Sequence, residues 1–493
     1  MKSIINFLII IGIVMSVGGC LNREHSSSKN AGYNVLFITI DDLRPQLGCY
    51  GDETVKTPNI DQLASRGVLF NRAYCQQALC GPSRASFLTG QRPGKIGVRD
   101  LHVHFRDVKP GIVTLPQLFK NNGYETMGLY KVFHLVGFDP DGFGNMNDTA
   151  SWTVPLWLPS RSAWGPYGDS IFQADYAEHL EKGPIGYGNI PRSLAYEAPE
   201  VADSMLSDGE AAQQAIRYIK KYKDQRFFIA VGFYKPHLPF VAPKKYWDLY
   251  KPNEIILPDN QYPPKGTPQY AVANNQELRS YVNIPNEGEF DEPLKKNLLH
   301  GYMASISYID QQVGLLLDEL ENQDLSDNTI VVVMGDHGYH IGEHSMWCKK
   351  HTNFEMAVRA PLIIYVPDKE RGYKTHSLTE FLDVYPTLAE LCGLDYPDDL
   401  DGKSLLPAFE NPDTTAHHVA FSSYPRGPGL GITMRTDRYR LTEWRDKKGT
   451  PVSYELYDHQ LDPNENVNKA SDPDYETITS DLIKKLNDNY PNN

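Results

Sequence analysis

The stretch NVLFITIDD, residues 34–42, indicates both the type of fold and the position of a site. Its first seven residues are mostly apolar and β-branched without a break, which is typical of a strand buried on both faces of a parallel sheet. The run leads directly into Asp41 and Asp42. Because open parallel sheets bind ligands outside the carboxyl ends of their strands, this acidic pair is a candidate site.

The same arrangement recurs in TIVVVMGDHG, residues 329–338, where the apolar run leads through Gly335 into Asp336 and His337. We therefore expect three carboxylates to converge from two strands. Like charges that lie so close require a cation, and hard oxygen ligands favour calcium or magnesium, with calcium better suited to irregular coordination. His337 is an unusual ligand for a hard ion and leaves manganese as an alternative.

The remaining pattern predicts two regions. In residues 33–410, apolar runs alternate with helical patterns, which predicts an α/β domain with a large, mostly parallel sheet flanked by helices. The further strands expected there are 126–130, 227–232 and 362–366, and the helices are 57–66, 115–122, 298–321 and 380–392. In residues 411–493, hairpin-like strands at 429–434, 439–444 and 453–457 precede a helix at 473–489, which predicts a smaller α+β subdomain.

The charge balance narrows the choice of partners. Among 493 residues, 62 are acidic and 48 are basic, giving a net charge of −14. This balance argues against a nucleic-acid partner and against a basic membrane-binding face. An anionic substrate stays possible, because a local group of basic side chains and bound metal can hold it.

The N-terminus has the features of a targeting segment. An apolar run at 4–17 follows Lys2 and ends in Val17-Gly18-Gly19-Cys20, which resembles a bacterial lipobox. We expect residues 1–19 to be a lipoprotein signal peptide, Cys20 to carry the lipid, and residues 20–32 to be a tether. The protein would then be exported and anchored to a bacterial membrane, facing the periplasm or on the outer membrane. An ordinary secretory signal or a short membrane anchor is the alternative.

The other five cysteines are scattered and indicate no disulfide scaffold, so a special thiol has to be recognised by its neighbours. Cys80-Gly81-Pro82-Ser83-Arg84 places Cys80 before an expected helix start, where free amides attract anions. As a bare thiol, Cys80 is either an activated nucleophile or a small buried residue beside a helix cap. Ser83 is a poorer nucleophile, because the segment lacks the last glycine of a nucleophile elbow.

The segment Cys-x-Pro-x-Arg with a following Leu88-Thr89-Gly90 resembles the signature of type I sulfatases, whose cysteine is oxidised to formylglycine. The resemblance covers residues 33 to about 463, and its motifs are most similar to the iduronate-2-sulfatase-like branch, which has His after the last metal Asp. It implies an alkaline-phosphatase-like sulfatase fold and one Ca²⁺ per chain. The metal ligands that it implies are Asp41, Asp42, Cys80, Asp336 and His337. The catalytic residues that it implies are Cys80, Arg84, Lys131, His134, His237 and Lys349.

The resemblance also implies a role for each residue. The hydrated aldehyde at position 80 attacks sulfur, with the metal polarising a sulfate oxygen. Arg84, Lys131 and Lys349 neutralise the sulfate oxygens. His237 or Lys349 protonates the departing sugar oxygen, and the residues leave that choice open. His134 is the expected base that expels sulfate and restores the aldehyde.

The implied partners are a sulfated carbohydrate and the enzyme that generates formylglycine. A uronate 2-O-sulfate of a glycosaminoglycan and an algal polysaccharide such as ulvan are both expected substrates, attacked at a chain end. Lys350 and His351 either recognise the acidic sugar or are solvated loop charges. Two other functions stay open: a phosphodiesterase or phosphonate monoester hydrolase, and a non-catalytic sugar-binding lipoprotein. The presence of Cys80 and of every metal Asp argues against the second.

Overall fold

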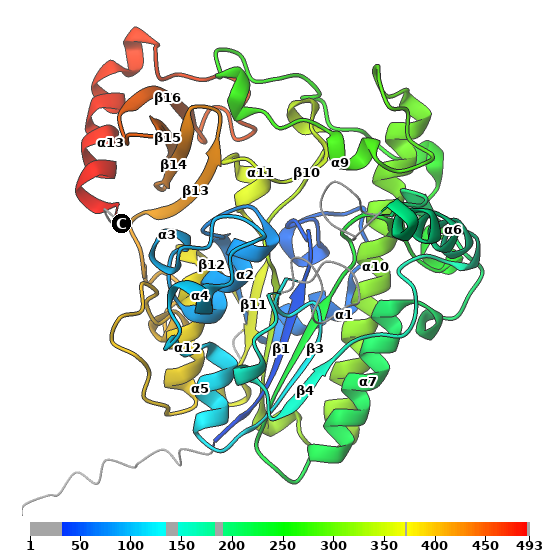
Figure 1. Ribbon diagram of the computed structural model, residues 1–493. Helices are drawn as coiled ribbons and strands as arrows, with labels where there is room; N and C mark the ends of the chain where they lie inside the picture. Colours follow the sequence, from blue (N-terminus) through cyan, green and yellow to red (C-terminus); the bar gives the residue numbers. More distant parts are fainter. Residues whose placement is uncertain (1–31, 135–145, 183–190, 370–371, 491–493) are drawn as a thin grey trace, which may run out of the picture. The chain divides into compact units, whose positions relative to one another are not determined.

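The main sheet has eight strands and places the ends of four adjacent parallel strands at one edge (Figure 1). The computed structural model describes residues 32–134, 146–182, 191–369 and 372–490. The sheet order is β12 (Tyr373–Glu380), β2 (Val68–Tyr74), β11 (Leu362–Tyr365), β8 (Thr329–Gly335), β1 (Asn34–Ile40), β6 (Phe227–Phe233), β3 (Glu125–Tyr130) and β4 (Val154–Trp157). The strand β11 runs antiparallel to both of its neighbours, and the other pairs are parallel.

Helices cover both faces of this sheet because the central strand β1 is apolar on both sides. Leu36, Ile38 and Ile40 pack into a core with α1, α7 and α10, whereas Val35 and Phe37 pack into a second core with α2, α5 and α12. The helices are α1 (Pro58–Arg66), α2 (Cys80–Thr89), α3 (Pro93–Ile96), α4 (Phe105–Val108), α5 (Leu115–Asn121), α6 (Pro166–Lys182), α7 (Ser207–Tyr222), α8 (Lys244–Trp247), α9 (Gln276–Arg279), α10 (Glu292–Asn322), α11 (Glu355–Val358), α12 (Val384–Leu391) and α13 (Glu476–Asn489).

A second, antiparallel sheet forms the C-terminal subdomain. Its strands are β13 (Ala420–Arg426), β14 (Gly429–Arg435), β15 (Tyr439–Asp446) and β16 (Pro451–Asp458), in that order. Its apolar face packs against α13, around Leu441, Leu456 and Leu486. Two short pairs complete the strands, β5 (Tyr196–Glu197) with β7 (Phe240–Val241) and β9 (His340–Ile341) with β10 (Trp347–Lys349).

The predicted architecture is confirmed, with differences at the edges. The strand expected at 34–40 has those bounds, and α10 begins at Glu292 rather than 298, because Asp291 caps it. The sequence prediction omitted β2, β4 and β12 of the main sheet, β13 of the second sheet, and the four short strands β5, β7, β9 and β10. The boundary at 411 stays a prediction, and residues 1–31, with the expected signal peptide, Cys20 and nearly all of the tether, lie outside the described residues. No helix in the described part of the chain has the length and apolar character needed to cross a membrane.

Candidate active site

Four neighbouring strand ends supply the polar residues of the site. Asp41 follows β1, Asp336 follows β8, Lys131 follows β3, and β6 leads into the segment that carries His237. Because β1 and β8 pair in register, with Ile40 opposite Gly335, the acids that follow them lie side by side. The expected convergence of the strand ends is therefore present in the structure.

The acids are held by the backbone. The amide of Asp42 donates to Asp336 Oδ1 at 3.1 Å, and Asp42 has a positive φ of 59°. This left-handed conformation turns the chain sharply after the strand. Asp41, Asp42 and Asp336 are all fully buried.

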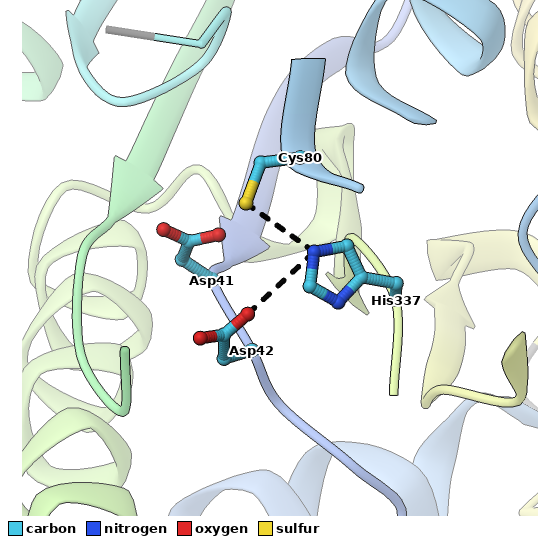
Figure 2. A group of neighbouring side chains, drawn as sticks. All are labelled: Asp41, Asp42, Cys80 and His337. Carbon is cyan, nitrogen blue, oxygen red and sulfur yellow. Dashed lines mark hydrogen bonds and ion pairs between the residues drawn. The ribbon is translucent and has the colours of Figure 1, made fainter. Parts of the chain in front are cut away.

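Cys80 joins this group from the opposite side as the first residue of α2. Its Sγ lies 3.3 Å from His337 Nε2, which in turn lies 3.5 Å from Asp42 Oδ1 (Figure 2). One ligand atom from each of Asp41, Asp42, Cys80 and His337 falls within 4.8 Å of the others.

The donor set fits a divalent cation. Asp41 Oδ1 and Asp42 Oδ1 are buried and accept no hydrogen bond from the described residues. Burial and the neighbouring acid Asp41 raise the pKa of Asp42 well above its usual range and that of Asp336 to about 7. Burial and Lys350 lower the pKa of His337 to about 3, so its imidazole stays neutral, as a metal ligand must. A bound cation would hold the carboxylates ionised.

Asp336 contacts this group, and each of its carboxylate oxygens already accepts one hydrogen bond while keeping a second lone pair. Its Oδ2 accepts from Arg84 Nε at 2.9 Å, and its Oδ1 accepts from the Asp42 amide. Arg84 is fully buried, lies 3.5 Å from Asp41 Oδ1, and donates to Thr39 and to the carbonyl of Val132. The buried Arg84 guanidinium therefore links the residues that follow β1, β8 and β3.

Two ammonium groups lie on the acidic pair. Lys131 Nζ contacts Asp41 Oδ2, and Lys350 Nζ lies 2.9 Å from Asp42 Oδ2. Lys131 reaches this position because its backbone passes directly over Gly232, where a Cβ would lie 2.0 Å from the Lys131 carbonyl carbon. Lys350 is only 2% exposed and is therefore no solvated loop charge.

Lys349 lies beside a third carboxylate, that of Glu277. Its Nζ lies 3.9 Å from Glu277 Oε2, on the side of the acidic pair where His237 also lies. His237 Nε2 lies 3.6 Å from Glu277 Oε1 and 3.8 Å from Asp42 Oδ2. Burial lowers the pKa of both His237 and Lys349, and the Glu277 carboxylate acts in the opposite direction on each.

His134 lies at the end of a described segment and is 6% exposed. Neither ring nitrogen has a hydrogen-bond partner among the described residues. Burial and Lys131 lower its pKa well below the usual range, so the imidazole is neutral and able to accept a proton. This state is compatible with the expected base.

Sequence reasoning missed two charged residues near the site. Glu277 comes from the four-residue helix α9, and Arg426 ends β13 in the C-terminal subdomain. Arg426 lies over the ring of Tyr424 and contributes to lowering the pKa of Lys349. Neither residue belongs to a motif, so only their place in the fold brings them to the site.

Most of the chain is similar to proteins of known family. The family model "Sulfatase" matches residues 33–394, and the model "N-sulphoglucosamine sulphohydrolase, C-terminal" matches residues 342–491. Human iduronate 2-sulfatase is 34% identical over 513 residues, covering 89% of this chain and 90% of that protein. An ulvan-active sulfatase of Formosa agariphila is 29% identical over 474 residues, covering 92% and 80%.

The solved structures agree on the fold. A phosphonate monoester hydrolase of Agrobacterium radiobacter superposes with a TM-score of 0.71 at 23% identity, covering 92% of this chain and 95% of that one. At this identity the likeness concerns the fold alone. Because the family model spans most of the chain and the human relative aligns over nearly its whole length, the chain belongs to the sulfatase family and is a sulfuric ester hydrolase.

Proposed function

We propose that this sulfatase removes sulfate from an acidic sugar at the end of a sulfated polysaccharide chain, using formylglycine at position 80 and Ca²⁺. The observation that carries the proposal is the placement of Cys80 Sγ 3.3 Å from His337, inside the group formed with Asp41 and Asp42. Asp41, Asp42 and His337 would hold the cation, with Asp336 at its edge. The cation would polarise a sulfate oxygen, and the hydrated aldehyde would supply the nucleophilic hydroxyl.

The cationic side chains bind and orient the sulfate group. Lys131 and Lys350 bring two ammonium groups to the acidic pair, so they are placed to neutralise charge that develops on sulfate oxygens. Arg84 keeps Asp41 and Asp336 in position. His134 has a neutral, buried imidazole and acts as the base that takes a hydroxyl proton from residue 80.

The proton for the leaving sugar oxygen comes from the group around Glu277. Both candidate acids, His237 and Lys349, face this carboxylate. His237 Nδ1 donates a hydrogen bond to the carbonyl of Leu238 at 2.7 Å, which leaves Nε2 facing Glu277 and Asp42. Burial lowers the pKa of either acid, and the Glu277 carboxylate counteracts part of this effect, which favours the protonated acid beside the leaving group.

The acidic sugar is recognised by basic residues beside the sulfate site. Burial lowers the pKa of both His351 and Lys349; the charge of Arg426 adds to this effect at both residues, and that of Lys349 adds to it at His351, so the three basic groups lie close together. Among the described residues Arg426 forms no ion pair, so its charge is available to a sugar carboxylate. The likeness to iduronate 2-sulfatase supports a uronate 2-O-sulfate, and the likeness to the ulvan-active sulfatase supports an algal uronate.

Export and maturation complete the proposal. The lipobox-like segment ending in Cys20 supports a lipid-anchored protein exposed to the periplasm or at the outer membrane. A formylglycine-generating or sulfatase-maturating enzyme would oxidise Cys80, which the segment Cys-x-Pro-x-Arg supports.

Mass spectrometry of tryptic peptides tests the modification, and metal removal tests the cation. We expect an aldehyde or its hydrate at residue 80, near-complete loss of turnover in Cys80→Ala, and loss of activity on chelation that calcium restores. Full sulfate release by protein that carries an unmodified thiol would contradict the proposal. A preference for a phosphonate monoester over a matched sulfate ester would identify the alternative hydrolase activity.

A further inference from the structure

A cavity of about 490 Å³ lies outside the catalytic site, and half of its lining residues are Arg or His. It is formed by β2, by α11 and the residue after it, by the end of β14 and the turn to β15, and by the segment that follows β16. The basic residues that line it are Arg72, Arg359, Arg435, Arg438 and His459. Nothing in the proposed reaction uses these residues, so the cavity needs its own explanation.

The strand β14 separates this cavity from the active site. Its first residue, Gly429, pairs with Arg426, which lies near Lys349, and its last residue, Arg435, lines the cavity. At roughly 3.3 Å per residue, the two ends of the seven-residue strand lie about 20 Å apart. A ligand in the cavity is therefore distinct from the sulfate group being hydrolysed.

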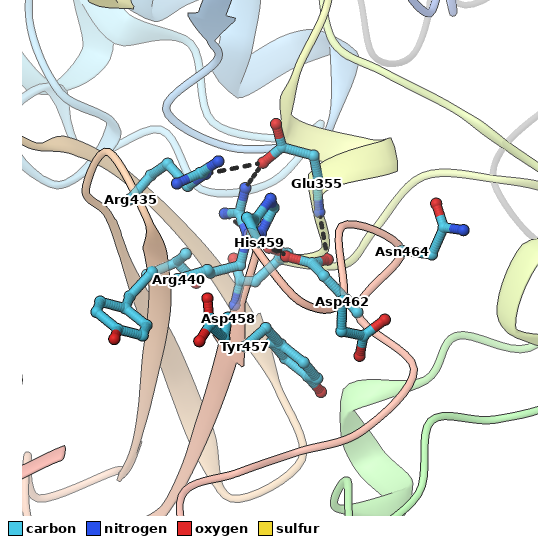
Figure 3. Close-up of polar contacts among 12 residues, drawn as sticks. Glu355, Arg435, Arg440, Tyr457, Asp458, His459, Asp462 and Asn464 are labelled. Carbon is cyan, nitrogen blue, oxygen red and sulfur yellow. Dashed lines mark hydrogen bonds and ion pairs between the residues drawn. The ribbon is translucent and has the colours of Figure 1, made fainter. Parts of the chain in front are cut away.

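The wall behind the cavity is a buried ion-pair network (Figure 3). Arg440, 1% exposed, contacts Glu355 and lies 2.6 Å from Glu465 Oε1. Arg435 Nε shares Glu355 at 3.3 Å, and His459 Nε2 lies 2.9 Å from Glu465. Glu355, His459 and Glu465 have the spacing of metal ligands. However, the Arg440 guanidinium already takes the place between the two carboxylates, so a cation is disfavoured there.

Positive charge is in excess around the cavity. Five guanidinium groups face four carboxylates in the lining and the wall behind it. The arginines are Arg72, Arg359, Arg435, Arg438 and Arg440, and the acids are Glu355, Asp437, Asp458 and Glu465. In a chain with a net charge of −14, this local excess favours an anionic ligand.

Two of the arginines are available to such a ligand. Arg359 donates to the carbonyl and the side-chain oxygen of Asn71 and, among the described residues, forms no ion pair. Arg72 donates to the backbone carbonyls of His376 and Asp437, and its only ion pair among the described residues is with Asp437 at 2.8 Å, whose side chain is 87% exposed. An exposed pair of this kind stabilises the protein little and is easily exchanged for another anion.

We propose that this cavity is a second, non-catalytic binding site for a sulfate oxyanion, held by Arg72 and Arg359. Guanidinium groups bind oxyanions through paired, charge-assisted hydrogen bonds. The oxyanion is either a sulfate group on a sugar chain or free inorganic sulfate. This binding does not depend on the proposed reaction.

Calorimetric titration in a Cys80→Ala background tests the proposal without turnover. The probes are sodium sulfate and a uronate 2-O-sulfate disaccharide, at matched ionic strength. We expect two binding events, and Arg72→Gln/Arg359→Gln should weaken the cavity event about tenfold or more. The exposed Arg217→Gln is the matched control and should keep both events. Equal affinity for the two probes identifies a site for free sulfate, and at least tenfold tighter sugar binding identifies a sugar sulfate.

A second variant keeps the test decisive if the double variant does not fold. Asp437→Asn removes only the exposed carboxylate that competes for Arg72, so it should tighten binding at the cavity. Crystals soaked in selenate should show anomalous scattering beside Arg359. The proposal is overturned if the double variant retains both binding events, if Asp437→Asn leaves the cavity affinity unchanged, or if selenate binds only beside residue 80.

Discussion

Lys349, the last residue of β10, and Lys350, which follows it, make different contacts. Replacing each by Met should therefore separate their roles. Lys350 Nζ lies 2.9 Å from Asp42 Oδ2, whereas Lys349 Nζ lies 3.9 Å from Glu277 Oε2. Loss of one preorganised group that stabilises transition-state charge costs about 10²–10³ in kcat. We therefore expect Lys350→Met to lower kcat by that factor on nitrophenyl sulfate, and Lys349→Met to lower it less than about tenfold.

The substrate is chosen because nitrophenolate leaves readily without a proton, so the acid role of the Glu277 group contributes little. Lys350→Met also leaves Asp42 buried without its ammonium partner, which costs about 3–5 kcal/mol of folding stability. Kinetics should therefore be measured with saturating calcium, and urea unfolding should confirm that each variant is folded. A Lys349→Met variant that loses as much kcat as Lys350→Met would refute the placement.

Two further predictions concern the surroundings of the reacting group. Glu277→Gln removes the carboxylate that raises the pKa of His237 and of Lys349, so the acid loses its proton at lower pH. The alkaline limb of the pH profile of kcat on a sugar sulfate should move to lower pH, with kcat at pH 8 about tenfold lower. Glu289→Gln, at an exposed position, serves as the control. An alkaline limb that does not move would exclude this role of Glu277. Arg426→Gln should raise KM for a uronate sulfate about tenfold or more but leave nitrophenyl sulfate within about twofold, and equal losses on both substrates would remove its specificity role.

The sheet could be predicted where strands are buried on both faces. The run at 34–40 shows a continuous apolar pattern because α1, α7 and α10 cover one face and α2, α5 and α12 cover the other. The strand β2 was missed because Asn71 and Arg72 interrupt its apolar run, and both side chains are only half-buried. The strand β12 was missed because it is an edge strand with a polar sequence. Its parallel partner β2 lies far earlier in the chain, with Val68 opposite Tyr373, so the pairing leaves no local signal.

The same reasoning separates the predictable part of the site from the rest. Asp41 and Asp336 follow two apolar strands that are buried throughout, and parallel pairing of these strands is sufficient to bring them together. Glu277 and Arg426 reach the site from α9 and β13, elements whose position depends on the packing of the whole chain. Local sequence carries no signal of that packing.

The choice between Lys349 and Lys350 shows where residue type stops being informative. Successive side chains of a strand point to opposite sides, so only one of two adjacent lysines can face the acids. Here the pairing of β9 with β10 shifts register after Trp347, and both Cys348 and His351 have positive φ, at 54° and 64°. These backbone turns direct Lys350 to Asp42 and Lys349 to Glu277. Since the two side chains are chemically identical, the backbone conformation alone places one beside Asp42 and the other beside Glu277.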